Sequence, residues 1–160
     1  MTTGARVLIL GTLPGVASLE AQAYYAHPRN TFWWIMSELL GFDAALPYEA
    51  RSQRLADSGI AVWDVIANCV RPGSLDSSIR QETLVPNDFS AVFDMQPGLR
   101  CLAFNGQAAR KLFRRHVEPQ LGKSLEQKQL LVMPSTSPAF AAMSRENKKR
   151  QWAAILDYLA

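Results

Sequence analysis

The residue types best suited to chemistry gather in one short segment, at Tyr24, Tyr25, His27, Arg29 and Asn30. An asparagine amide is no general base at neutral pH, but it can orient a water molecule and stabilise developing charge. A histidine can donate hydrogen bonds, an arginine can meet an anion, and a tyrosine ring can act as a stacking platform. Each side chain also has a structural alternative that spacing leaves open: a helix N-cap for the amide, a loop brace for the imidazole, and core or surface positions for the others.

A second group of polar residues follows later predicted strands. Asn105 comes directly after an apolar run, where its amide can present a paired donor and acceptor. Its alternative is turn chemistry, because Asn-Gly is a strong turn signal. Residues 135–137 (STS) also follow an apolar run, and we expect a helix directly after them. Hydroxyl groups and free backbone N–H groups in such a loop suit a phosphate.

Strand-like and helix-like segments alternate along the chain and must position these residues. Short apolar runs predict buried strands within Arg6–Gly11, Ile60–Ile66, Leu99–Phe104 and Gln129–Met133. Helical spacing and capping residues predict helices over Asn30–Leu40, Pro47–Ser58, Asn87–Met95, from Gly106 to about His116, and from Ser144 onward. Residues 67–78 carry pattern-breaking residues and are expected to be irregular.

This alternation predicts an α/β fold, a three-layer sandwich whose central, mainly parallel sheet is flanked by helices. At 160 residues the chain is expected to form a single domain spanning residues 1–160. Ligands bind at the carboxyl ends of the strands in such sheets. The loops after Gly11, Phe104 and Met133 should therefore converge on one site.

Composition excludes several classes of protein. The chain is 48% hydrophobic and 19% charged, which is a globular composition. Cys69, Cys101, His27 and His116 lack the spacing of metal ligands, so we expect no metal and no cofactor. No apolar run has membrane-spanning length, and Met1–Arg6 lacks a secretory signal, so we expect a cytoplasmic protein without a membrane partner.

Charge is unevenly distributed along the chain. Residues 1–99 carry a net charge of −4 and residues 100–160 a net charge of +7, for a total of +3. A basic second half suits a phosphate backbone, although solvated helix faces would give the same pattern.

Several stretches resemble one known family. They are GTLPG at residues 11–15, AHPRNTFW at 26–33, GSLDSSIR at 73–80, FNG at 104–106 and MPSTSPA at 133–139. Together they resemble the uracil-DNA glycosylase superfamily, most closely its hypoxanthine-DNA (deoxyinosine) glycosylase branch, which is related to the mismatch-specific uracil/thymine-DNA glycosylases. The resemblance covers nearly the whole chain in the right order.

The resemblance implies a monomeric enzyme that flips a deaminated base out of double-stranded or single-stranded DNA and hydrolyses its N-glycosidic bond. The base would be hypoxanthine, with uracil and xanthine left open. The resemblance implies Asn30 as the catalytic residue. It implies a base pocket made by Leu13, Tyr25, His27 and Asn105. It implies contact with the DNA backbone, and a wedge into the base stack, by Arg29, Ser135, Thr136, Ser137, Ala139 and Phe140, with further phosphate contacts from Arg145, Lys148, Lys149 and Arg150.

Leu13 departs from the family pattern. Relatives place a catalytic Asn or Asp in the middle of the first motif, and leucine can replace neither, so the chemistry should depend on Asn30. No lysine falls in the GTLPG or HPRN motifs, which favours simple hydrolysis over a Schiff-base mechanism. The main alternative is a nucleic-acid-binding module that keeps the fold with little or no activity. An α/β hydrolase is disfavoured because the chain contains no GxSxG motif.

Overall fold

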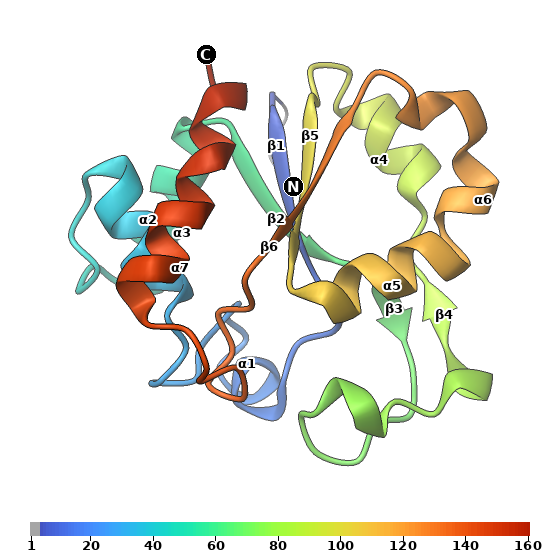
Figure 1. Cartoon of the computed structure of the whole chain (residues 1–160), viewed down its shortest axis with the longest axis horizontal. Coiled ribbons are helices and arrows are strands. Elements are labelled where there is room, and N and C mark those ends of the chain that lie inside the picture. The colour runs from blue at the N-terminus through green and yellow to red at the C-terminus, as the bar shows by residue number, and fades with distance from the viewer. Residues whose placement is uncertain (1–3) are drawn as a thin grey trace.

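The computed structural model describes residues 4–160, and its core is a four-stranded parallel sheet (Figure 1). The prediction for the first six residues falls in part on Met1–Thr3, which lie outside the described residues. The strands lie in the order β2-β1-β5-β6. Their bounds are β1 Val7–Gly11, β2 Ile60–Asp64, β5 Cys101–Asn105 and β6 Gln129–Met133. The four predicted strands and the parallel sheet are therefore confirmed.

Every residue of β1 is buried because the sheet is covered on both faces. Leu8 and Leu10 pack into one apolar cluster, and Val7 and Ile9 pack into another. This alternation follows from the two-residue period of a strand.

Two helical layers cover these faces and complete the predicted three-layer sandwich (Figure 1). The cluster around Val7 contains residues of α2 (Phe32–Leu40), α3 (Tyr48–Asp57), α7 (Arg145–Trp152) and the 3-10 helix η4 (Ala153–Tyr158). The cluster around Leu8 contains residues of α4 (Phe89–Met95), α5 (Gln107–His116) and α6 (Glu118–Leu121). The remaining helical turns are α1 (Val16–Glu20), η1 (Asp76–Ser78), η2 (Gln81–Thr83) and η3 (Gly122–Leu125). Among residues 4–160, no helix is long and apolar enough to span a bilayer.

The order of the strands creates a switch point in the sheet. From β1 the chain first moves to β2 on one side, and later to β5 and β6 on the other. The loops that leave β1 and β5 therefore diverge and leave a crevice at the carboxyl ends of these strands.

The segment expected to be irregular contains structure that the sequence did not predict. β3 (Ile66–Asn68) pairs antiparallel with β4 (Val85–Pro86), and η1 and η2 lie between these two strands in the chain. Strands of three and two residues are too short to show a period, so no local pattern could reveal them. This small sheet holds the chain between β2 and α4 beside the end of the main sheet (Figure 1).

Candidate functional site

A cavity of about 420 Å³ lies at the carboxyl ends of the strands, where the sequence predicted a site. The three predicted loops all line it, so their convergence is confirmed. A fourth segment, after β2, joins them. The lining comprises residues 11–18 with Glu20, Tyr24, Tyr25, His27, Asn30, Asp64, Arg71, Ser74, Asp76, Asn105 and residues 135–138.

Gly11 ends β1 at a place where a side chain would collide with a neighbouring carboxyl group. A Cβ atom added there would lie 2.7 Å from Oδ1 of Asp64. Gly11 pairs with Asp64 in the parallel register of β1 and β2, so the two residues are held side by side. The absent side chain is what lets this carboxyl group lie against the backbone of the neighbouring strand.

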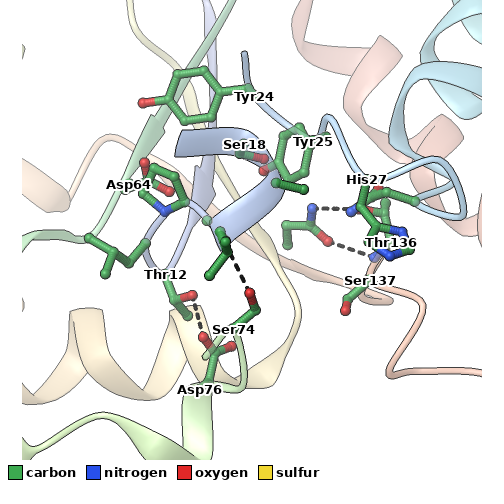
Figure 2. A pocket seen from close by; sticks show the side chains of 18 of the residues that line it. Thr12, Ser18, Tyr24, Tyr25, His27, Asp64, Ser74, Asp76, Thr136 and Ser137 are labelled. Atoms are coloured by element: carbon green, nitrogen blue, oxygen red, sulfur yellow. Dashed lines mark hydrogen bonds between the residues drawn. The ribbon is translucent and has the colours of Figure 1, made fainter. Parts of the chain in front are cut away.

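Asp64 is a buried residue of the cavity lining that the sequence patterns did not single out. It is 6% exposed, and burial raises the pKa of its carboxyl group to about 7. Hydrogen bonding from the Tyr24 hydroxyl and the charge of Arg71 act in the opposite direction, while Asp76 adds to the rise in pKa. Figure 2 shows Asp64 beneath Tyr24 at one side of the cavity. The available signal was an acidic residue closing an apolar run at the carboxyl end of a strand.

A network behind the cavity holds the first loop in place. Arg71 donates hydrogen bonds to the carbonyl oxygens of Leu13 and Pro14 and forms an ion pair with Asp76 at 3.5 Å. Thr12 Oγ1 donates to Asp76 Oδ1 at 2.6 Å, and this bond is visible in Figure 2. Because the guanidinium group is committed to these partners, it organises the loop. Leu13, a predicted pocket residue, lines the cavity and also packs against the core.

Tyr25 lines the cavity with a left-handed backbone, at φ 56°. Its ring stacks on Phe32, with ring centroids 4.0 Å apart. One face of the tyrosine is therefore covered, and a planar ligand could stack only on the other. Burial and the negative charge of Asp64 raise the pKa of Tyr25, while the Asn105 amide acts in the opposite direction.

Asn30 and His27 combine structural roles with places in the cavity lining. The helix α2 begins at Phe32 and not at Asn30, so the predicted start is corrected by two residues. Asn30 Oδ1 still accepts a hydrogen bond from the Phe32 N–H at 3.0 Å. His27 Nδ1 accepts from the backbone N–H of Arg29 at 3.1 Å, and the His27 carbonyl oxygen accepts from the Asn30 N–H. These bonds orient both side chains, while the Arg29 side chain is exposed outside the lining.

Asn105 braces the loop after β6. Its Nδ2 donates to Thr136 Oγ1 and its Oδ1 accepts from the Thr136 N–H, both at 2.9 Å. An amide has a second donor hydrogen and a second acceptor lone pair, so Asn105 keeps capacity for a ligand. Thr136 is fully buried, so the prediction that it contacts DNA is wrong, and it anchors the loop instead.

The loop that contains Ser135 and Ser137 does not lead directly into a helix. The next helix begins at Arg145, so the helix N-terminus expected beside the serines is absent there. The hydroxyls of Ser135 and Ser137 instead accept from the backbone N–H groups of Ser137 and Ala139. Both serines nevertheless line the cavity.

The tip of this loop is open to solvent. Ala139 is exposed and Phe140 is 37% exposed, so Phe140 is no core residue. Lys148 Nζ donates to the Phe140 carbonyl oxygen at 2.8 Å and lies 5.1 Å from the centre of its ring. Lys148 itself is 3% exposed, so the prediction that it contacts phosphate is wrong. The Lys148 ammonium group therefore stabilises the loop tip through its contacts with Phe140.

The described residues, 4–160, contain no cluster of three or more His, Cys, Asp or Glu side chains that could hold a metal ion. Cys101 is fully buried and Cys69 is half-buried.

Comparisons with known proteins agree with this architecture. The chain is 37% identical over 151 residues to the hypoxanthine DNA glycosylase of Methanosarcina acetivorans, covering 93% of this chain and 89% of that protein. It is 38% identical over 102 residues to the hypoxanthine DNA glycosylase of Methanosarcina barkeri, covering 63% of each. A Methanosarcina acetivorans protein solved by solution NMR as a candidate uracil DNA glycosylase has a TM-score of 0.81 and 34% identity. That match covers 99% of this chain and 93% of the other.

The family model described as the uracil DNA glycosylase superfamily matches residues 1–160. With a parallel sheet, a cavity at its switch point and relatives of this identity, the chain belongs to the uracil DNA glycosylase superfamily.

Proposed function

We propose that this protein is a monofunctional DNA glycosylase that hydrolyses the N-glycosidic bond of a deaminated base, with hypoxanthine as its principal substrate. The observation that carries the proposal is the 37% identity over 151 residues to a hypoxanthine DNA glycosylase. The cavity adds chemical support, because amide, hydroxyl and aromatic groups line a space of about 420 Å³, a typical size for a small-molecule site. Release of the base would leave an abasic site, the first product of base excision repair.

Asn30 is the proposed catalytic residue. When the C1′–N bond breaks, positive charge develops on the sugar and negative charge on the base. The Asn30 amide can orient the attacking water and stabilise that charge without itself taking a proton. Its hydrogen bond from the Phe32 N–H holds the side chain at the cavity wall before substrate arrives. This preorganisation supports the assignment, because no energy is needed to orient the amide during the reaction.

The flipped base would lie between the first loop and the residues of the AHPRN segment. Tyr25 would stack on the base with the ring face that Phe32 leaves uncovered. His27 would donate from Nε2, because its Nδ1 already accepts from the Arg29 N–H. Leu13 and the remaining capacity of Asn105 would complete the pocket.

The rim of the cavity would contact the DNA. Arg29 is exposed and can reach a phosphate, while Ser135 and Ser137 lie where the backbone of a flipped nucleotide would pass. Phe140 and Ala139 stand exposed at the loop tip, and an apolar side chain inserted there would fill the vacated stack. Phe140 has the larger ring and is the stronger choice for the wedge.

The proposed product is an intact strand with an abasic site. A glycosylase that also cleaves the strand forms a Schiff base through an amine beside the sugar. Among the described residues that line the cavity there is no lysine. Hydrolysis by water therefore fits the side chains that surround the site.

The test is base release from duplexes that contain hypoxanthine, xanthine, uracil or a thymine mismatch. We expect release from hypoxanthine, and Asn30→Ala should slow it about 10²- to 10³-fold while DNA binding persists. Asn68→Ala, at an exposed asparagine of β3 outside the cavity, is the matched control and should retain full activity. Salt-dependent binding with no release from any duplex would instead identify a non-catalytic nucleic-acid-binding module.

A further inference from the structure

The cavity contains a carboxyl group that the proposed function does not use. Three acidic side chains line it, from Glu20, Asp64 and Asp76. Glu20 is exposed, and Asp76 is engaged by Thr12 and Arg71. Asp64 alone among these three is buried, at 6% exposure.

The fold builds a specific place for Asp64. The missing side chain of Gly11 makes room for its carboxyl group, and the backbone carbonyl of Asp64 accepts a hydrogen bond from Asn87 Nδ2 at 2.9 Å. Arg71, the cation whose charge acts on Asp64, is committed to Asp76 and to two backbone carbonyls of the first loop. Burying an acid without a committed cation favours its neutral form.

We propose that Asp64 is the general acid that protonates the base as it leaves. This inference rests on the proposed function. Asn30 would orient the attacking water, whereas Asp64 would protonate the leaving base. A purine suits this role because N7 and N3 remain as proton acceptors while the bond to N9 breaks.

The proton transfer from Asp64 conserves atoms and charge. The electron pair of the C1′–N9 bond moves onto the base as the bond breaks. The proton of the Asp64 carboxyl group moves to a ring nitrogen of the base, which departs neutral and leaves a carboxylate. Water adds to C1′ and releases a proton, and this proton restores the acid. A positioned acid of this kind contributes about 10²- to 10⁴-fold to the rate.

The surroundings of the carboxyl group set the pH range of the reaction. The titratable and charged groups that act on it are Tyr24, Tyr25, Arg71 and Asp76. Burial outweighs the hydrogen bond from Tyr24 and the charge of Arg71, and the pKa of Asp64 is raised to about 7. Below this pH the acid holds its proton. Above it the active fraction falls about tenfold per pH unit.

The experiment measures single-turnover release of hypoxanthine by the full chain between pH 5.5 and pH 9. For the unmodified protein we expect a plateau at low pH and a fall of about 50-fold between pH 7, where half of the acid is protonated, and pH 9. Asp64→Asn keeps the size of the side chain but carries no acidic proton, so the rate at pH 6 should fall about 10²- to 10⁴-fold and lose this pH dependence. Asp94→Asn, at an exposed carboxyl group of α4, is the matched control and should keep the rate and the profile.

Several results would overturn the proposal. A rate that stays flat or rises between pH 7 and pH 9 in the unmodified protein would exclude the acid, even if Asp64→Asn failed to fold. Equal rates and profiles for Asp64→Asn and the unmodified protein would also exclude it. A chemical role for Asp64 requires that Asp64→Asn bind the duplex as tightly as the unmodified protein and lose only the first-order rate constant. Loss of affinity with an unchanged rate constant would instead indicate a structural role. Absence of release at any pH would refute the proposed function itself, a distinguishable outcome.

Discussion

The burial of Asp64 has a consequence for stability that needs no substrate to observe. The pKa of an ordinary aspartate is 3.8, and burial raises that of Asp64 to about 7. Between these values the folded protein binds a proton that the unfolded chain has lost. The free energy of unfolding therefore falls as pH rises through this window, and the loss is complete above pH 7.

The size of this effect follows from the shift in pKa. One pKa unit corresponds to about 1.4 kcal/mol, so the ionised carboxyl group costs the fold about 4 kcal/mol at pH 8 relative to pH 4. Asp64→Asn removes the ionisation and keeps a side chain of the same shape. The unfolding free energy of the unmodified protein should therefore fall by about 4 kcal/mol more than that of Asp64→Asn between pH 4 and pH 8.

Urea unfolding of both proteins across this pH range, followed by circular dichroism, provides the measurement. Asp94→Asn serves again as the control, because it makes the same change of side chain at an exposed position. If the unmodified protein and Asp64→Asn show the same pH dependence, then Asp64 is ionised in the folded state at neutral pH. The reasoning from burial would then be refuted together with its use as an acid.

Three further predictions concern the walls and rim of the cavity. Gly11→Ala should lower the free energy of unfolding by about 1–3 kcal/mol and slow base release, because the added Cβ meets Asp64 Oδ1 at 2.7 Å. Thermal unfolding measures the loss of stability, and an unchanged melting temperature would contradict it. Thr136→Val should lower the free energy of unfolding by about 1–3 kcal/mol, because Asn105 Nδ2 loses its acceptor. Urea unfolding measures this loss, and unchanged stability would contradict the prediction. Phe140→Ala should leave stability within about 0.5 kcal/mol, since the ring is exposed, and should slow release from duplex more than from single-stranded DNA; equal slowing on both would count against a wedge.

The local patterns predicted most of the fold correctly for physical reasons. The apolar run of β1 and the spacing of α2 and α7 reflect burial against a core, which acts on residues close together in sequence. Ser144 caps α7 as expected, because a serine there accepts from the Asn147 N–H three residues on. The prediction of convergent loops held because the carboxyl ends of parallel strands meet.

The errors have a common physical origin in contacts between distant segments. Thr136 and Lys148 carry polar groups and looked like surface residues, but tertiary partners bury them. Thr136 accepts a hydrogen bond from Asn105, and Lys148 donates one to the Phe140 carbonyl oxygen, so both polar groups are satisfied in the interior. No pattern within one segment reports such pairing.

By itself, the sequence determined the alternation of strands and helices, the edge of the sheet that carries the site, and the segment that contains Asn30, because each depends on local periodicity or on a contiguous motif. Only the tertiary structure decided which polar side chains face the cavity and in what state. Asp64 lies against Gly11 because the register of β1 and β2 brings together residues far apart in the chain. Its raised pKa arises from burial by the whole fold, which no sequence pattern can measure.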